Sequence, residues 1–132
     1  MKMNPKVLVV EDEANVVELL KVNLGAGGFD VDVAMDGEEG MRKVMQGGHD
    51  AVVLDIRLPL KNGWQVCREI KANTKTSRIP VVILTAATQK SDYEESKNAG
   101  CDLYLSKPFD PCELVDAVKE AINRNRNARL NK

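Results

Sequence analysis

Short apolar runs alternate with amphipathic segments along the chain. Five segments have the pattern of strands, at residues 6–10, 30–34, 51–54, 80–84 and 102–105, and five have the pattern of helices, at 14–24, 37–46, 63–73, 90–99 and 111–125. Strict alternation of strands and helices is typical of a parallel sheet joined by right-handed crossover connections. The pattern therefore predicts an α/β fold.

The strand-like segments differ in composition, and the difference predicts their order in the sheet. The first, third and fourth segments are continuous apolar runs, as expected for strands covered by helices on both faces. The second segment alternates between polar and apolar residues and the fifth is mixed, which is typical of edge strands. These features predict a doubly wound five-stranded parallel sheet of order 2-1-3-4-5, the flavodoxin-like (βα)5 arrangement.

Residues with capping chemistry lie at several predicted helix ends. Asp110 precedes Pro111 and Glu113 at the start of the last helix, and Asp36 has capping-box spacing with Glu39. Glycines are expected to end the first, second and fourth helices in a left-handed conformation. These glycines are Gly25, Gly47 and Gly100.

A polar residue that can take part in chemistry follows each of four apolar runs. Glu11 and Asp12 follow the first run and Asp55 follows the third. Thr85 follows the fourth run, and Lys107 comes shortly after the last. In a doubly wound sheet, ligands bind at the carboxyl ends of the strands, where the strand order reverses. The three acids are expected at that point, between the first and third strands.

Three carboxylates in one crevice require a positive partner. At a separation of ~4 Å and an effective dielectric constant of ~20, each like-charged pair costs on the order of 4 kcal/mol. Lys107 is one candidate partner, and a hard divalent cation such as Mg²⁺ or Mn²⁺ is the other. An aspartate can also attack phosphorus to form an acyl phosphate, with a metal, a cation and a hydroxyl around the phosphoryl group. Asp55, at the end of the central strand, is the predicted nucleophile.

Composition limits the other classes of function. The 132 residues suit one domain, and the net charge of -1 gives no reason to expect nucleic acid or an anionic membrane as a partner. No apolar stretch approaches the ~20 residues that span a bilayer, and no signal peptide is recognisable, so a cytoplasmic location is expected. Three cysteines without C-x-x-C spacing fit a reducing compartment, and the single histidine, His49, is expected in a surface loop.

Four motifs together resemble the receiver domain of two-component response regulators, including the single-domain chemotaxis regulators. The similarity covers residues 5 to 125, so a receiver domain is predicted at 1–125 and a short basic polar tail at 126–132. Each motif is weak alone, but the set is highly specific because the order and spacing also match. The motifs are Val9-Val10-Glu11-Asp12-Glu13, Leu54-Asp55-Ile56-Arg57-Leu58-Pro59 with Gly63, Leu84-Thr85-Ala86 and Leu105-Ser106-Lys107-Pro108-Phe109.

The resemblance implies how the site would accept a phosphoryl group. Asp55 matches the phosphoacceptor, Thr85 the hydroxyl that follows the phosphoryl group, and Lys107 the lysine that binds it. The bond from Lys107 to Pro108 is typically cis in this family. Thr85 and Tyr104 match the switch pair, in which the aromatic ring turns inward after phosphorylation.

The resemblance also implies a metal site for Mg²⁺, or for Mn²⁺. Four positions match the family's metal ligands: Glu11, Asp12, Asp55 and the backbone carbonyl of Arg57. Asp12 matches a direct ligand, and Glu11 matches an acid that acts through water. Glu11 stands where Asp is common, so its extra methylene should alter the metal–water geometry. Arg57 is expected to form an exposed salt bridge, for which Glu13 is a candidate partner.

The implied function is signalling by phosphorylation. A histidine kinase or a histidine phosphotransfer protein would donate the phosphoryl group, and the chain would catalyse only its own phosphorylation and dephosphorylation. The surface of the fourth helix, fifth strand and fifth helix would bind a downstream protein, with the chain a monomer or a transient dimer. The fourth helix fits a movable element and a solvated surface helix equally, because only Tyr93 and Ala99 are apolar between residues 90 and 100.

Other functional classes are open or disfavoured. The chain is either a stand-alone receiver or the receiver of a longer response regulator or hybrid kinase, and a receiver-like domain that binds partners without accepting phosphate is the further alternative. An aspartyl-phosphate phosphatase is disfavoured because Arg57 occupies the place of its second acid. A nucleotide- or flavin-binding module is disfavoured because the glycine-rich segment 25–28 follows a helix instead of a strand.

Overall fold

The sheet has the predicted topology. In the computed structural model, which describes residues 4–86 and 90–130, five parallel strands lie in the order β2-β1-β3-β4-β5. Each strand lies within one residue of its predicted bounds, and β2 and β5 are the edges, as their compositions predicted. The strands are β1 (Lys6–Val10), β2 (Asp30–Ala34), β3 (Ala51–Asp55), β4 (Val81–Thr85) and β5 (Leu103–Ser106).

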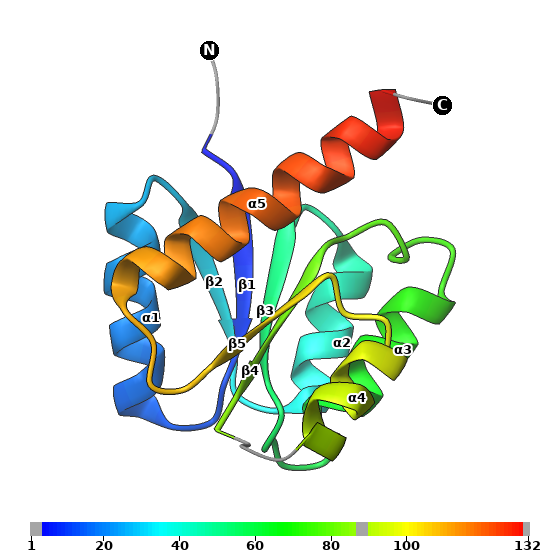
Figure 1. Cartoon of the computed structure of the whole chain (residues 1–132), viewed down its shortest axis with the longest axis horizontal. Coiled ribbons are helices and arrows are strands. Elements are labelled where there is room, and N and C mark those ends of the chain that lie inside the picture. Colours follow the sequence, from blue (N-terminus) through cyan, green and yellow to red (C-terminus); the bar gives the residue numbers. More distant parts are fainter. Residues whose placement is uncertain (1–3, 87–89, 131–132) are drawn as a thin grey trace.

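Helices cover both faces of the sheet (Figure 1). They are α1 (Ala14–Ala26), α2 (Gly37–Gln46), α3 (Gly63–Ala72), α4 (Lys90–Asn98) and α5 (Pro111–Leu130). On one face, Leu20 of α1 and Leu114 of α5 belong to the same apolar core. On the other face, Val44 of α2 and Ile70 of α3 belong to a second core. Every residue of β3 is buried between these layers, which explains why the first four residues of the strand are all apolar.

Two helices run further than predicted. α5 continues to Leu130, so residues 126–130 of the basic polar tail are helical. This segment contains no glycine or proline that would stop the helix. α1 continues to Ala26, which places Gly25 inside the helix, and the left-handed residue that follows is Gly28 (φ 94°). None of the described helices is long and apolar enough to cross a membrane.

The predicted caps of α2 are present. The Asp36 side chain accepts a hydrogen bond from the Glu39 N–H at 2.8 Å. Gly47 follows the helix with φ 86°, and Gly100 follows α4 with φ 89°, both in the left-handed region that favours glycine. Local sequence chemistry was therefore sufficient to place these helix ends.

A polar cluster of Asp32, Lys43 and His49, here called the edge cluster, covers part of strand β2. Alternate residues of β2 bond to β1, and the N–H and C=O of Val33 face away from the sheet. The Val33 N–H donates to Asp32 Oδ1 (2.9 Å), and the Val33 C=O accepts from Lys43 Nζ (2.5 Å). Lys43 Nζ also donates to Asp32 Oδ1 (3.0 Å). Both outward backbone groups of Val33 are thus bonded to side chains.

His49 lies in a loop as predicted, but its side chain is buried, so the predicted surface exposure is wrong. Its side chain is 3% exposed, and its Nε2 lies 3.0 Å from Asp32 Oδ2. Burial alone raises the pKa of Asp32, but hydrogen bonds from His49 and Lys43 outweigh this effect and lower the pKa to about 2. Asp32 is therefore ionised at neutral pH, and His49 Nε2 donates to it. No local pattern signals this contact, because Asp32 and His49 are 17 residues apart.

Candidate functional site

The predicted polar residues meet at the carboxyl edge of the sheet. Asp55, the last residue of β3, stands opposite Leu84 of β4 in the strand register. Thr85, the last residue of β4, stands opposite β5, which leads to Lys107. The side chains that follow the strands line an open pocket of about 720 Å³. Its walls include Asp12, Asp55, Arg57, Trp64, Thr85 and Lys107.

Asp55 is held by one cation and one backbone N–H. Lys107 Nζ donates to Asp55 Oδ2 at 2.9 Å, and the Arg57 N–H donates to Oδ1 at 3.1 Å. Burial alone raises the pKa of Asp55, but its contacts with Glu11 and Lys107 outweigh burial and lower the pKa. Asp55 is therefore an ionised carboxylate, which is the form that a nucleophile requires.

Helix α3 begins directly against the backbone of Asp55. The Gly63 N–H donates to the Ile56 C=O at 2.8 Å, and a Cβ on Gly63 would lie 2.3 Å from the Asp55 carbonyl oxygen. Only glycine fits this approach. Asn62 and Gln65 form a capping box, with each side chain accepting from the other residue's N–H at 2.9 Å. This box was missed by the sequence predictions, although its spacing is readable in the chain.

Glu11 lies behind the pocket and is absent from its walls. It is 1% exposed, and neither carboxylate oxygen accepts a hydrogen bond from a described residue. Burial and the contact with Asp55 together raise the pKa of Glu11 to about 8, and Lys107 only partly offsets this rise. A buried carboxyl group in this state favours the arrival of a cation or a proton.

The acids fit a hard cation that keeps part of its water shell. Asp12 is exposed and lines the pocket. Residues 4–86 and 90–130 contain no group of three or more His, Cys, Asp or Glu side chains that could hold a metal by themselves. Mg²⁺ does not require such a group, because it commonly binds through one or two carboxylates plus water and other oxygens. Asp12 and Asp55, which both line the pocket, are two acids of the kind that such an ion uses.

Lys107 and Thr85 are joined through the backbone. The Lys107 N–H donates to the Thr85 C=O at 2.8 Å, which extends the pairing of β4 and β5 toward the pocket. The peptide bond from Lys107 to Pro108 is cis, as the resemblance implied. Thr85 is 1% exposed and lines the pocket beside Asp55. Thr85 and Lys107 thus line the same pocket as Asp55.

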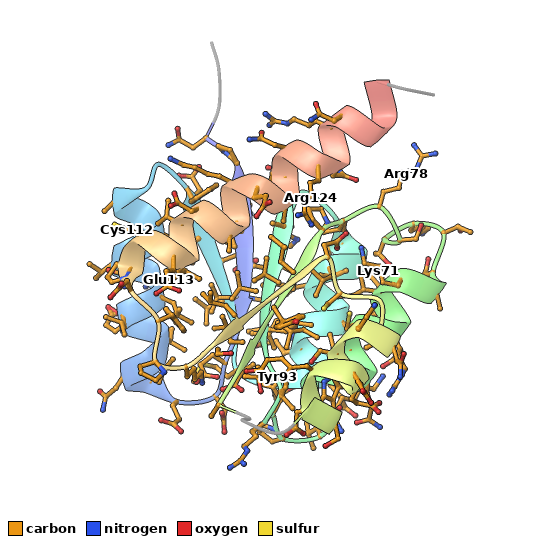
Figure 2. All side chains as sticks on the ribbon, viewed as in Figure 1. Lys71, Arg78, Tyr93, Cys112, Glu113 and Arg124 are labelled. Carbon is orange, nitrogen blue, oxygen red and sulfur yellow. The ribbon has the colours of Figure 1, made fainter. Side chains whose placement is uncertain are left out.

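Tyr104 is exposed on β5 and is not one of the pocket-lining residues. It is 46% exposed, and its ring centroid lies 5.0 Å from that of Tyr93 on α4. The Tyr93 hydroxyl is hydrogen-bonded to the Ser106 hydroxyl at 2.7 Å. Figure 2 shows Tyr93 near the carboxyl ends of the strands, away from Arg124 on α5. The inward turn expected of Tyr104 stays a prediction.

Arg57 does not form the predicted salt bridge. It is exposed and lines the pocket together with Glu13, but within the described ranges the two side chains make no ion pair. The hydrogen bond from its N–H to Asp55 fixes the Arg57 backbone at the pocket. The Arg57 side chain is therefore an exposed part of the pocket wall.

This combination of fold and pocket matches a known family of signalling domains. The family model of the response regulator receiver domain matches residues 7–119. The chain belongs to this family. It is therefore a receiver domain of two-component signal transduction, and the order of its strands and its family membership are both as predicted.

The curated relatives of this receiver domain are longer proteins. It is 38% identical over 126 residues to the alkaline phosphatase synthesis transcriptional regulatory protein PhoP of Bacillus subtilis, covering 96% of this chain and 52% of PhoP. It is 40% identical over 123 residues to the DNA-binding response regulator MtrA of Mycobacterium tuberculosis, covering 93% of this chain and 53% of MtrA. The chain spans about half the length of these relatives.

Solved structures of similar length share the whole fold. One is the receiver domain of a sensor histidine kinase from Pseudomonas aeruginosa, with a magnesium ion coordinated in its active site cleft. It has a TM-score of 0.85 and 32% identity, covering 91% of this chain and 98% of that one. The chemotaxis response regulator CheY4 of Vibrio cholerae has a TM-score of 0.84 and 26% identity, covering 91% of this chain and 99% of that one.

Proposed function

We propose that this receiver domain accepts a phosphoryl group on Asp55 from a phosphohistidine of a histidine kinase or a histidine phosphotransfer protein. The main support for this proposal is the ionised and accessible carboxylate of Asp55. Its ionised carboxylate ends the central strand, is open to a pocket of about 720 Å³, and has Lys107 Nζ at 2.9 Å. A nucleophile and a phosphate-binding cation therefore share one site.

The proposed step transfers a phosphoryl group from nitrogen to oxygen. One carboxylate oxygen of Asp55 bonds to phosphorus while the N–P bond of the donor breaks, and the imidazole leaves with the electron pair and takes up a proton. Lys107 shifts its hydrogen bond to the phosphoryl oxygens, and the Thr85 hydroxyl binds another of them. The chain catalyses this reaction and the hydrolysis of its own acyl phosphate, with no other substrate.

The residues at the pocket fit the Mg²⁺ ion that we propose as the cofactor, with Mn²⁺ as a substitute. When bound, the ion neutralises charge on the transferring group. Asp12, Asp55 and the Arg57 carbonyl would hold it, with Glu11 acting through water. Two observations support this assignment: the oxygens of buried Glu11, which accept no hydrogen bond from a described residue, and the magnesium ion in the Pseudomonas aeruginosa receiver domain.

The proposed output surface consists of α4, β5 and α5. Tyr104 of β5 packs against Tyr93 of α4, so a rotation of Tyr104 would alter the surface of both elements. The names of PhoP and MtrA support an output in transcription when such a receiver is part of a longer regulator. A separate target protein would read the same surface. We propose a cytoplasmic location, where these partners meet the domain.

The decisive experiment is incubation with Mg²⁺ and a small phosphodonor such as acetyl phosphate, followed by intact-mass measurement. Wild type should gain one phosphoryl group, and chelation of the metal should prevent the gain. Asp55→Asn should gain none, because its amide is not a nucleophile. Asp30→Asn is the matched control, since Asp30 is an exposed acid on β2, and it should react like wild type. No adduct on wild type, or an equal adduct on Asp55→Asn, overturns the proposal.

A further inference from the structure

Helix α4 is joined to helix α3 mainly by polar contacts. Among its described positions 91–98, the one buried residue is Ser96, which is 0% exposed. An ion pair joins Glu95 to Arg68 of α3, and the Cys67 thiol of α3 contacts the Ala99 C=O just after the helix, with Sγ and O 3.4 Å apart. Such contacts are directional, so a small displacement of α4 would break them and let water replace them.

Trp64 connects α4 to the wall of the pocket. Its indole N–H donates to Ser96 Oγ at 2.9 Å, and the same residue lines the pocket around Asp55. Trp64 follows Gly63, whose position against the Asp55 carbonyl fixes the start of α3. One side chain therefore links the end of β3 with the only buried side chain described in α4.

Asp92 places a second part of α4 at the same pocket. It lies in the first turn of the helix and lines the pocket with Trp64. A phosphoryl group on Asp55 would add about −1.5 to −2 charges there. Repulsion between that charge and Asp92 favours a displaced α4, whereas the bond between Trp64 and Ser96 holds the helix in its present position.

We propose that Trp64 is a positioning residue whose hydrogen bond to Ser96 couples the loading of the Asp55 pocket to the position of α4. The inference rests on the phosphoacceptor function proposed above. Coupling between a site and a structural element is reciprocal. If loading the pocket opposes the bond, removing the bond must strengthen binding at the pocket.

The test measures the affinity of the whole chain for beryllofluoride, a phosphoryl mimic, in the presence of Mg²⁺. Ser96→Ala should bind the mimic about fivefold more tightly than wild type, the order expected from one net hydrogen bond. Ser91→Ala is the matched control, because Ser91 is exposed on the same helix, and its affinity should equal that of wild type. Trp64→Phe should reproduce the gain, and the double variant Trp64→Phe/Ser96→Ala should gain no more than either single variant.

Trp64 also provides a direct optical readout, because it is the only tryptophan in the chain. The mimic should change its emission in wild type, and Ser96→Ala should show part of that change before the mimic is added. A purely structural bond would lower the melting temperature of Ser96→Ala without altering affinity. That result, with wild type binding the mimic, overturns the inference and leaves the proposed function standing. A wild type that neither binds the mimic nor forms the phosphoryl adduct overturns both.

Discussion

The edge cluster and the Asp55 pocket are built from similar charged residues, but only the edge cluster is balanced. Both oxygens of Asp32 accept hydrogen bonds, from Lys43 and His49. In the pocket, Asp55 is similarly paired with Lys107, whereas buried Glu11 accepts no hydrogen bond from a described residue and has another acid, Asp55, as its neighbour. The two clusters do not differ in the number of their charges. They differ because the pocket contains one buried carboxyl group, that of Glu11, to which no described residue donates a hydrogen bond.

The edge cluster also contains one buried polar atom without a hydrogen-bond partner, but leaving this atom unpaired costs less free energy. His49 Nδ1 is buried and has no partner within the described ranges. Nδ1 is a single ring nitrogen, whereas Glu11 leaves both oxygens of a buried carboxyl group without a hydrogen-bond donor. One ring nitrogen without a partner costs less than a buried carboxylate without a donor. The contrast between the two clusters therefore lies in charge, and it can be tested at both.

The largest effect is expected from removing the unbalanced acid. Glu11→Gln should raise the free energy of unfolding by about 3 kcal/mol at pH 8, because Gln has no charge to desolvate. The pKa of Glu11 is raised from 4.5 to about 8, so its ionisation opposes folding increasingly as pH rises through this interval. The gain should nearly vanish at pH 4. Urea unfolding at pH 4, 6 and 8 measures it, with Glu18→Gln as an exposed control on α1. A gain in the free energy of unfolding that does not depend on pH would mean that the ionisation of Glu11 is not its cause.

The opposite sign is expected in the edge cluster. Asp32→Ala should lower the free energy of unfolding by about 2 kcal/mol at pH 7, because Lys43 and His49 lose a charged acceptor. The pKa of Asp32 is lowered from 3.8 to about 2, so its contribution is complete above pH 3.8 and is lost as pH falls through 2. Urea unfolding of both proteins should therefore converge at pH 2. If Asp32→Ala is as stable as wild type at pH 7, the hydrogen bonds of Asp32 do not stabilise the fold as expected.

Mg²⁺ should stabilise the pocket without affecting the edge cluster. At ten times its dissociation constant, the ion should add about 1.4 kcal/mol to the free energy of unfolding. Thermal melting with and without Mg²⁺ measures the gain, which Asp12→Asn should abolish. Asp32→Asn should retain the full response to Mg²⁺. Equal responses of the two variants would show that the ion binds without using Asp12.

The smallest effect concerns the backbone beside the pocket. Leu60, in the loop after Asp55, has φ 71° and is 70% exposed. A left-handed conformation strains leucine by roughly 1 kcal/mol, and the greater freedom of glycine in the unfolded chain offsets part of that. Leu60→Gly should therefore stabilise the fold by about 0.5 kcal/mol in urea unfolding. Leu60→Ala keeps the Cβ and should show no gain, whereas equal gains would assign the effect to the lost apolar side chain.

The sequence predicted those features that repeat along the chain or follow from local chemistry. Alternation predicted the α/β class, and the polar residues of β2 predicted an edge strand. Acids at strand ends predicted a shared site, because the ends of parallel strands must meet. The contacts of His49 with Asp32 and of Trp64 with Ser96 were not predicted, since they span 17 and 32 residues and depend on helix packing. The burial of Glu11 beside Asp55 is likewise a property of the assembled fold.

The side chains around Val33 have a consequence for crowded solutions. A free edge strand offers a row of unpaired backbone groups to which a strand of another molecule can bind. At Val33 the N–H is already bonded to Asp32 and the C=O to Lys43. An incoming strand would have to displace two charged side chains and leave them without their present partners. This part of β2 therefore resists the joining of sheets between neighbouring molecules, which is the first step of fibrous aggregation.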